Sequence, residues 1–245
     1  MKDYFSQRSE SYAKYRPVYP TELYQYILSY VTEKNLAWDC GTGNGQTAAA
    51  LSPYFSKVWA TDISQQQLNH AVKLPNVSYS LEPAEHASLQ DNSVNLICIS
   101  QALHWFNFTQ FYKEVKRVAA PRAVIAAWSY NLFNADNFTN AITEAFYRDT
   151  LKNYWDVERQ YVDDGYKNIP FPFENIESPA FAIQVKWTLD ELTGYLETWS
   201  AVQKFITENN YNPVPHIADK LKKRWPANEK RKILFPLKLK LAYIH

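Results

Sequence analysis

Cysteine is nearly absent from this 245-residue chain, and long apolar runs are absent altogether. Cys40 and Cys98 cannot build a disulfide framework and lack the spacing of metal ligands, so we expect both to be reduced core residues. No run of about 18 apolar residues and no N-terminus of the signal-peptide type occurs, so we expect a soluble, cytoplasmic protein that is not bound to a membrane.

An excess of charge of either sign is also lacking. The 26 basic and 25 acidic residues leave a formal net charge of +1, which creates no field to attract nucleic acid or an anionic membrane. The histidines show no ligand spacing with one another, so no metal site is predicted. We expect a small neutral or anionic partner, and a protein that is a monomer or a homodimer.

Glycine is scarce too, yet three of the five glycines lie within five positions, at Gly41, Gly43 and Gly45. Glycine is needed where the backbone takes a positive φ or approaches a ligand closely. The cluster directly follows the apolar run 36–40, which is typical of a strand. The pattern therefore predicts a loop between a strand and a helix that cradles a nucleotide-like ligand.

Apolar runs typical of buried strands alternate with helical segments over residues 20–130. We predict helices that begin near Thr21, at Gln46, after a Ser64 cap and after an Asn107 cap. Several strands are almost wholly apolar, which indicates a parallel sheet buried on both faces, that is, an α/β, Rossmann-like fold with helices on both faces. The predicted strands are 36–40, 57–61, 77–81, 94–100 and 123–128.

The pattern changes after the fifth predicted strand. Residues 129–179 are aromatic, Asn-rich and interrupted by proline, and we interpret 131–180 as a helical insertion that could act as a lid. Alternating runs at 181–187 and 234–244 would complete a seven-stranded, mostly parallel sheet. We thus expect one domain, 1–245, made of an N-terminal part (1–35), a ligand-binding core (36–130), the insertion (131–180) and the completing strands and helices (181–245).

Two acidic residues flank the glycine loop. Asp62 ends the second predicted strand, where a carboxylate typically binds two ribose hydroxyls. Asp39 lies just before the loop, where it would repel a phosphate and favour a cationic ligand. The third glycine also comes one residue too early for the Gly-x-Gly-x-x-Gly pattern of dinucleotide sites. These features favour S-adenosylmethionine, which carries a ribose and positive charge.

Five short stretches, in a fixed order, carry a family resemblance. They are Tyr12-Ala13-x-Tyr15-Arg16-Pro17-x-Tyr19-Pro20, Asp39-x-Gly41-x-Gly43-x-Gly45-Gln46, Ala60-Thr61-Asp62-x-Ser64, Ala84-Glu85 and Gln101-Ala102-x-His104-Trp105-Phe106. With them the chain resembles class I S-adenosylmethionine-dependent methyltransferases, in particular the branch that includes trans-aconitate methyltransferases. The chain departs from the family's pattern at Pro121-Arg122-Ala123, where Pro-Gly-Gly is common, and at Asn107, where Asp often stands.

The resemblance implies S-adenosylmethionine as cofactor, a small-molecule methyl acceptor, and helices within 1–35 that cover the cofactor. The residues implied to contact the cofactor are Asp39, Gly41, Thr42, Gly43, Gly45, Asp62, Ile63, Ala84, Glu85 and Gln101. The first five would hold the methionine part, the sixth the ribose and the next three the adenine, while the backbone of the last would lie near the sulfonium. Structural alternatives remain open: Asp39 could satisfy loop amides, Asp62 could cap a helix, and Glu85 could be a surface residue.

Two residues are candidates for the reaction itself. His104 follows the fourth strand and could orient the acceptor or take a proton, or could simply pack beside Trp105 and Phe106. Arg16 could bind a carboxylate of the cofactor or the acceptor, or could lie on the surface. A carboxylate acceptor, with an ordinary pKa near ~4, would need no base, whereas a phenol or amine would make His104 the obvious base.

A carboxylic acid is the favoured acceptor. A low-polarity aromatic pocket is expected to favour a reaction that loses charge, which gives Trp105, Phe106, Trp128 and Tyr130 a reason to lie near the site. The first alternative is methylation of RNA or protein, but the stretch 101–104 lacks the Asn-Pro-Pro-Tyr type of motif found in amino-methylating nucleic-acid enzymes. The second is a cofactor-binding protein without catalysis, because intact glycines indicate binding and not turnover.

Overall fold

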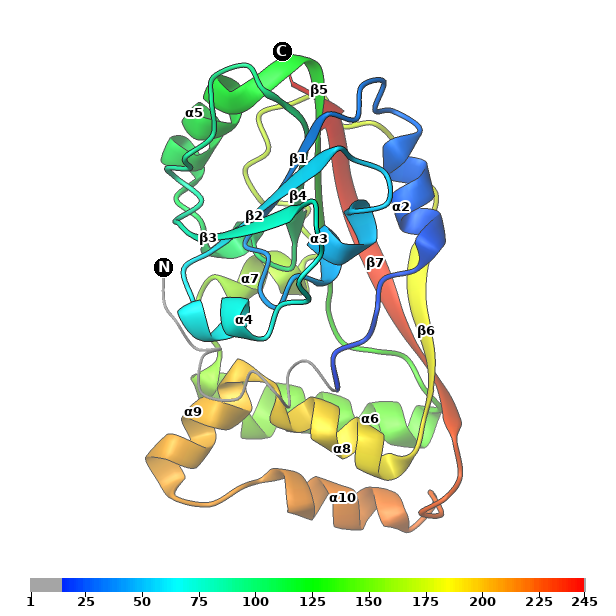
Figure 1. Ribbon diagram of the computed structural model, residues 1–245. Coiled ribbons are helices and arrows are strands. Elements are labelled where there is room, and N and C mark those ends of the chain that lie inside the picture. The colour runs from blue at the N-terminus through cyan, green and yellow to red at the C-terminus, as the bar shows by residue number, and fades with distance from the viewer. Residues whose placement is uncertain (1–14, 245) are drawn as a thin grey trace.

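A seven-stranded sheet forms the centre of the computed structural model, which describes residues 15–244 (Figure 1). The strand order is β3-β2-β1-β4-β5-β7-β6. Strands β1 to β5 pair in parallel, and β7 is antiparallel to both β5 and β6. The predicted seven-stranded, mostly parallel sheet is therefore confirmed.

Most predicted elements have the predicted bounds, because glycine, proline and capping residues mark their ends. The strands are β1 (Leu36–Cys40), β2 (Lys57–Asp62), β3 (Val77–Leu81), β4 (Val94–Ser100), β5 (Ala119–Tyr130), β6 (Phe181–Trp187) and β7 (Arg231–Tyr243). The α-helices are α2 (Thr21–Leu28), α3 (Gln46–Leu51), α4 (Gln65–Asn69), α5 (Phe108–Val118), α6 (Asn137–Ala145), α7 (Arg159–Asp163), α8 (Leu189–Glu197), α9 (Ser200–Asn209) and α10 (Val214–Lys222). Short 3₁₀ or π segments are η2 (Leu103–Trp105), η3 (Phe146–Thr150) and η4 (Lys152–Tyr154).

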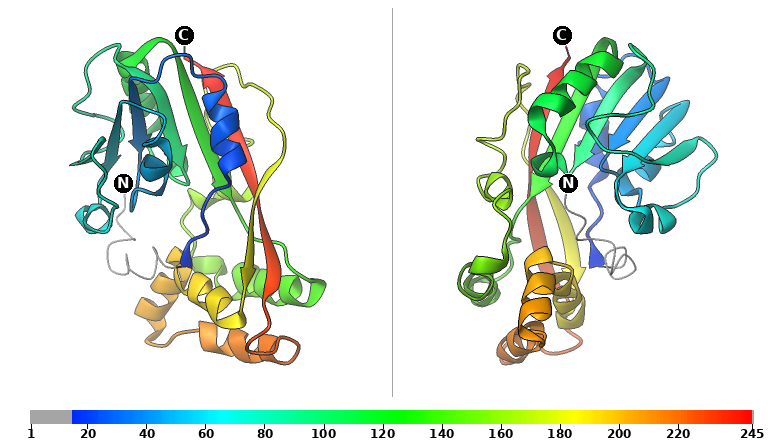
Figure 2. Two further views of the ribbon diagram at one scale, coloured as in Figure 1. Left: turned by 45° about the vertical axis from the view of Figure 1, so that its right-hand side comes forward. Right: turned by 90° about the vertical axis from the view of Figure 1, so that its left-hand side faces the viewer.

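The sheet is buried on both faces, as its apolar strands predict. Neighbouring residues of one strand point to opposite faces, so Ala37 belongs to the core beneath α2 and α3, and Trp38 to the core beneath α5. The turned views show α2 and α5 on opposite sides of the sheet (Figure 2). Cys40 and Cys98 are buried free thiols on these strands, which confirms the prediction that both are reduced core residues.

The carboxyl ends of the central parallel strands lie side by side. Strand β1 pairs with β2 on one side and β4 on the other, and Asp39 aligns with Ala60 and Cys98. The chain proceeds from β1 outward to β3 and then returns to β4, so the order reverses beside β1, where open α/β sheets bind ligands. The segments that follow β1, β2 and β4 therefore meet at one edge of the sheet.

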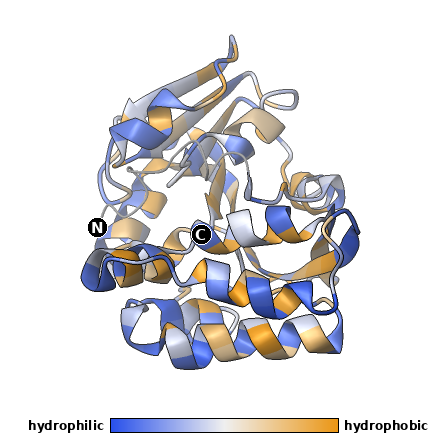
Figure 3. Cartoon of the chain, turned by 90° about the horizontal axis from the view of Figure 1, so that it is seen from below, coloured by the Kyte–Doolittle hydropathy of each residue, from blue (hydrophilic) through white to orange (hydrophobic). Residues whose placement is uncertain are grey.

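A layer of helices lies beyond that edge (Figure 1). It contains α6 from the predicted insertion, and α10 packs against both α6 and α8 while α9 packs against η4. Viewed from below, these helices carry both hydrophobic and hydrophilic residues (Figure 3). The layer thus draws on residues 189–222 as well as on 131–180. None of the helices that residues 15–244 form combines the length and apolar character needed to cross a bilayer.

Strand β5 starts four residues earlier than predicted. Its first residue, Ala119, pairs with Val94 before a register shift, and Arg122 follows with a φ of 63°. That left-handed conformation is the one a glycine adopts without strain. Arg122 therefore takes a conformation suited to glycine, at the position where the proteins that the chain resembles commonly have glycine.

Candidate functional site

The glycine loop is fixed against the end of β2. The amides of Gly41 and Thr42 both donate to the carbonyl of Thr61, at 2.9 Å each, and the Gly45 amide donates to Thr42 at 3.0 Å. The three glycines have φ values of 70°, 57° and 80°. These are left-handed conformations that side chains rarely adopt, so the cluster of glycines has a backbone cause.

The three glycines have different surroundings. A Cβ on Gly41 would lie 2.6 Å from the Cβ of Ala102, and a Cβ on Gly45 would collide with the Tyr79 hydroxyl. Among the described residues, a Cβ on Gly43 would meet only the Gln67 side chain, at 3.9 Å. Gly41 and Gly45 thus allow close packing within the protein, whereas the backbone at Gly43 adjoins open space that a ligand can enter.

Asp39 is fully buried beneath the loop. Its Oδ2 accepts hydrogen bonds from the Thr42 hydroxyl at 2.5 Å and from the Ala48 amide at 2.8 Å. Burial raises the pKa of Asp39 to about 7, although these two hydrogen bonds act to lower it. Oδ1 has no hydrogen-bond partner among residues 15–244. Asp39 therefore shapes the loop, as the structural alternative predicted, and keeps one unsatisfied oxygen.

Asp62 stands at the end of β2 and contacts the loop directly. Its Oδ2 accepts from the Gly43 amide at 2.8 Å, and its Oδ1 accepts from the Ser64 amide at 2.9 Å. Ser64 then caps α4 through the Gln67 amide. Asp62 thus links the loop to the next helix and holds its carboxylate at the shared edge, while the half-buried Ile63 follows it.

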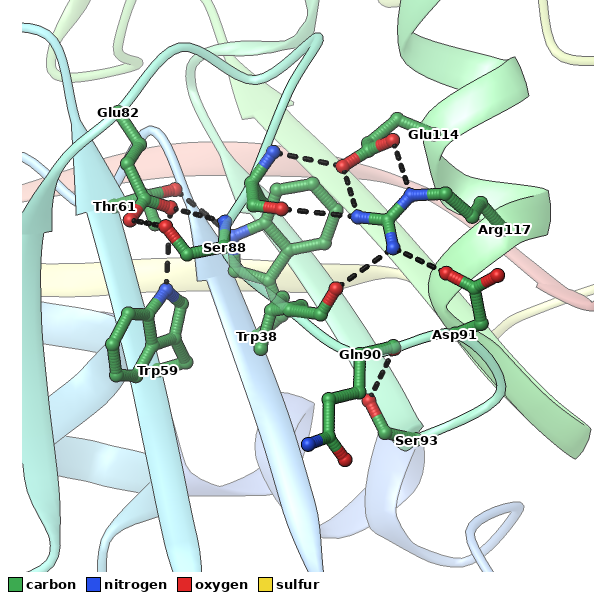
Figure 4. Close-up of polar contacts among 12 residues, drawn as sticks. Trp38, Trp59, Thr61, Glu82, Ser88, Gln90, Asp91, Ser93, Glu114 and Arg117 are labelled. Atoms are coloured by element: carbon green, nitrogen blue, oxygen red, sulfur yellow. Dashed lines mark hydrogen bonds and ion pairs between the residues drawn. The ribbon is translucent and has the colours of Figure 1, made fainter.

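Arg117 holds the segment between β3 and β4 in place (Figure 4). Its guanidinium donates to both oxygens of Glu114, at 2.8 and 2.6 Å, and to Asp91 at 2.6 Å. It also donates to the carbonyls of Ala87 and Leu89. In the same view, Glu82 accepts hydrogen bonds from side chains around it. This segment is therefore ordered by polar contacts with α5.

Two of the three residues predicted to frame adenine lie on this segment. Ala84 is buried, and Glu85 is half-buried. The Glu85 carboxylate accepts a 2.7 Å hydrogen bond from the amide of Asn107, the residue that caps α5. Glu85 thus binds the start of α5 in this structure, a role that the sequence did not predict.

Gln101 has an unusual conformation at the end of β4. Its φ is 56°, its amide donates to Trp128, and its side-chain nitrogen donates to the carbonyl of Tyr130 at 2.9 Å. The side-chain oxygen is buried and has no hydrogen-bond partner in the described part of the chain. Strained backbone and an unsatisfied acceptor at one residue are features that functional sites tolerate.

A pocket lies beside Gln101, between the sheet edge and the helical layer. It contains two guanidinium groups, several aromatic rings and the His104 imidazole, and its lining is Arg16, Gln101, His104, Trp105, Tyr130, Trp155, Asp156, Arg159, Tyr195, Trp199 and Ser200. The carboxylate of Asp156 pairs with Lys204 at 2.8 Å. The pocket therefore has an excess of positive charge in an aromatic surrounding, which suits a small organic anion.

His104 and Arg16 were both predicted at this place. Arg16 donates to the Tyr130 hydroxyl at 3.1 Å and lies over the Tyr195 ring. His104 is buried, its Nδ1 is 3.0 Å from the Tyr166 hydroxyl, and burial lowers its pKa to about 3, with a further contribution from Arg159. A histidine that stays neutral in this way is a poor general base near pH 7.

The aromatic prediction holds only in part. Trp105 and Tyr130 line the pocket, but Trp128 is fully buried in the core against Tyr19 and Tyr24. Trp128 and Tyr130 are two residues apart on β5 and belong to the same face of the sheet, and the Trp128 carbonyl accepts a hydrogen bond from the Gln101 amide. Trp128 therefore lies beside the site through its backbone, while its side chain does not line the pocket, and Phe106 lies beside Gly41 and does not line the pocket either.

Arg159 and the aromatic residues around it were missed. Arg159 donates to the Tyr147 hydroxyl and to Asn131, each at 2.9 Å, and its guanidinium lies 4.9 Å from the Trp155 ring. The one available signal was an arginine among aromatic residues of the insertion. Of the N-terminal segment 1–35 predicted to cover the cofactor, residues 1–14 lie outside the described residues.

Comparison with known proteins decides the family. A model described as a methyltransferase domain matches residues 38–127. A Dictyostelium discoideum protein named as a methyltransferase is 37% identical over 231 residues, which is 93% of this chain and 88% of that protein. The chain belongs to the class I S-adenosylmethionine-dependent methyltransferases.

A solved structure supports the same assignment for the fold. A protein from Anaeromyxobacter dehalogenans, named as a type II methyltransferase, gives a TM-score of 0.85 at 34% identity and covers 93% of this methyltransferase and 97% of that chain. A Saccharomyces cerevisiae protein named as an S-adenosylmethionine-dependent methyltransferase is 26% identical over 178 residues, 68% of this chain and 60% of that protein. The cofactor is therefore S-adenosylmethionine. These three names state no methyl acceptor.

Proposed function

We propose that this methyltransferase transfers a methyl group to the carboxylate of a small organic acid, as the trans-aconitate branch does. The observation that carries the proposal is the pair of guanidinium groups, Arg16 and Arg159, in one aromatic pocket beside the end of β4. Guanidinium groups bind carboxylates through planar, paired hydrogen bonds. The one acidic residue that lines this pocket, Asp156, pairs with Lys204 and does not cancel that charge.

The residues at the sheet edge fit the cofactor. Open space adjoins Gly43, and the buried Oδ1 of Asp39 lacks a hydrogen-bond partner, so a cationic ligand with N–H donors would complete this site. We assign the methionine part to Asp39 and the glycine loop, and the ribose to Asp62. The adenine would lie beside Ile63 and Ala84. S-Adenosylmethionine supplies a methyl group bound to a sulfonium.

The reaction needs alignment more than proton transfer. A carboxylate oxygen forms a bond to the methyl carbon while the carbon–sulfur bond breaks, and both the carboxylate charge and the sulfonium charge disappear. The carboxylate is already ionised near pH 7, which agrees with a neutral His104. Arginine contacts stabilise the ionised acid by about 1.5–3 kcal/mol. Correct positioning can lower the barrier by about 7–11 kcal/mol, so the anchors favour the reaction overall.

An assay with methyl-labelled cofactor and a set of carboxylic acids tests this function. We expect a labelled small molecule whose label is released by mild base, as a methyl ester requires. A base-stable product, or label found only in added RNA or protein, would contradict the proposal. No label in any product, with cofactor binding intact, would instead support a non-catalytic relative.

Arg159 provides the matched test of the pocket. Arg159→Gln should lower kcat/KM for the acid about 10–100-fold, because loss of a charge-assisted hydrogen bond costs about 1.5–3 kcal/mol. Arg148→Gln is the control, since Arg148 is exposed on the same insertion and pairs with Glu144. Arg159→Lys separates charge from geometry and should recover part of the loss. Equal activity of the Arg159→Gln and Arg148→Gln variants would contradict the proposed role.

A further inference from the structure

The insertion brings a second group to the site, the phenol of Tyr166. Tyr166 is fully buried, follows α7 and has a φ of 62°. Its hydroxyl lies 3.0 Å from Nδ1 of His104, which belongs to η2 at the end of the β4 segment. α7 packs against η2, so the two residues meet because the insertion folds onto the sheet edge.

The direction of this hydrogen bond follows from its surroundings. His104 is neutral, so only one ring nitrogen carries a proton. Burial raises the pKa of Tyr166 well above its usual range, so the phenol keeps its proton. The hydroxyl is fully buried, and Nδ1 of His104 is the acceptor that the described residues offer it, so its proton is directed to Nδ1. The ring proton therefore belongs on Nε2.

Nε2 is the ring atom that remains for a molecule in the pocket. His104 lines the pocket, and its Nε2 makes no hydrogen bond within residues 15–244. Nε2 is also not one of the polar atoms that are fully enclosed by the protein and lack a partner, so it is not shut off from the pocket. Arg159, Arg16 and Asp156 are the charged groups that share this pocket, and the two arginines disfavour a charged imidazole.

We propose that Tyr166 is a positioning residue that fixes His104 as the Nε2–H tautomer, so that His104 donates a hydrogen bond to the methyl acceptor and does not act as a base. The proposal rests on the proposed function, because a carboxylate acceptor offers oxygens to this donor and requires no base. Arg16, Arg159 and His104 then present donors to one anion.

Nitrogen-15 NMR of histidine-labelled protein tests the tautomer without any acceptor. His104→Gln identifies the His104 signals among those of the five histidines. We expect the wild type to show the Nε2–H tautomer, unchanged between pH 5.5 and 8. Tyr166→Phe keeps the ring and removes the hydroxyl, so we expect a mixture of tautomers. An Nδ1–H tautomer in the wild type, or an unchanged tautomer in Tyr166→Phe, would overturn the proposal.

Kinetics with the acid found above separate a donor from a base. Glutamine places an N–H donor near the position of Nε2 but takes no proton at neutral pH, so His104→Gln should keep kcat/KM within about 10-fold of the wild type, whereas His104→Leu should lose more. Tyr166→Phe should raise KM more than it lowers kcat. A pH profile with an apparent pKa of about 6–7 that disappears in His104→Gln would show a base and overturn the proposal. If no acid is methylated but the tautomer is as expected, the proposed function fails and the tautomer assignment stands.

Discussion

Replacing Gly41 and Gly43 separately by alanine should produce two different defects. Both glycines have left-handed φ values, 70° and 57°, which cost a residue with a side chain about 1–2 kcal/mol. At Gly41 the added Cβ would also lie 2.6 Å from Ala102 and 3.3 Å from Phe106. Such overpacking typically costs a further 1–3 kcal/mol. We therefore expect Gly41→Ala to lose about 2–5 kcal/mol of unfolding free energy, and Gly43→Ala about 1–2 kcal/mol.

The two variants should rank in the opposite order for cofactor binding: Gly43→Ala, the more stable of the two, should bind the cofactor more weakly. The Cβ at Gly43 projects into space that we assign to the cofactor, so Gly43→Ala should weaken binding at least about 10-fold while it remains the more stable variant. Urea unfolding without cofactor measures stability, and calorimetric titration with S-adenosylhomocysteine measures binding. Wild-type affinity in Gly43→Ala, or equal stability of the two variants, would refute the assignment of these glycines.

Two further predictions concern buried carboxyl groups. Burial raises the pKa of Asp39 in the folded protein to about 7, so the folded protein holds this proton more strongly than the unfolded chain does. Stability should therefore fall as pH rises from roughly 4 to 7. Asp39→Asn should remove this part of the pH dependence of urea unfolding, and an unchanged pH dependence would refute the prediction. Burial acts to raise the pKa of Glu114, but hydrogen bonds from Arg117 and Ala87 outweigh burial, so the pKa of the folded protein lies below its usual value. The contribution of the ionised Glu114 to stability is therefore present above about pH 4 and lost as pH falls. Arg117→Gln should cost about 2–4 kcal/mol at pH 7 and less in acid, as chemical unfolding at both pH values would measure, and a loss independent of pH would contradict the ion pair's role.

The parallel strands could be predicted from sequence because their signals are local. The run 36–40 is mostly apolar, has an acidic residue just before its end and is followed by glycine, and its bounds are those of β1. The predicted bounds 94–100 are likewise those of β4. The early start of β5 at Ala119 depends on pairing with Val94, a contact between distant residues that no local pattern contains.

The acceptor side of the site was predicted less completely for the same reason. His104 and Arg16 belong to short motifs near the sheet, and the structure brings both to one pocket. Arg159 and Tyr166 come from the insertion, whose aromatic and polar residues show no clear period, and their positions depend on how the insertion packs on η2. Glu85 belongs to a short motif, but its contact with the Asn107 amide could not be predicted, since that contact requires the neighbouring helix to be in place.

A crystal structure with S-adenosylhomocysteine and the methylated acid would test the central claim most directly. We predict that the ribose hydroxyls bind the Asp62 carboxylate and that the sulfur points toward Gln101, with the ester between Arg16, His104 and Arg159. A ribose bound elsewhere, or a sulfur directed away from this pocket, would contradict the account.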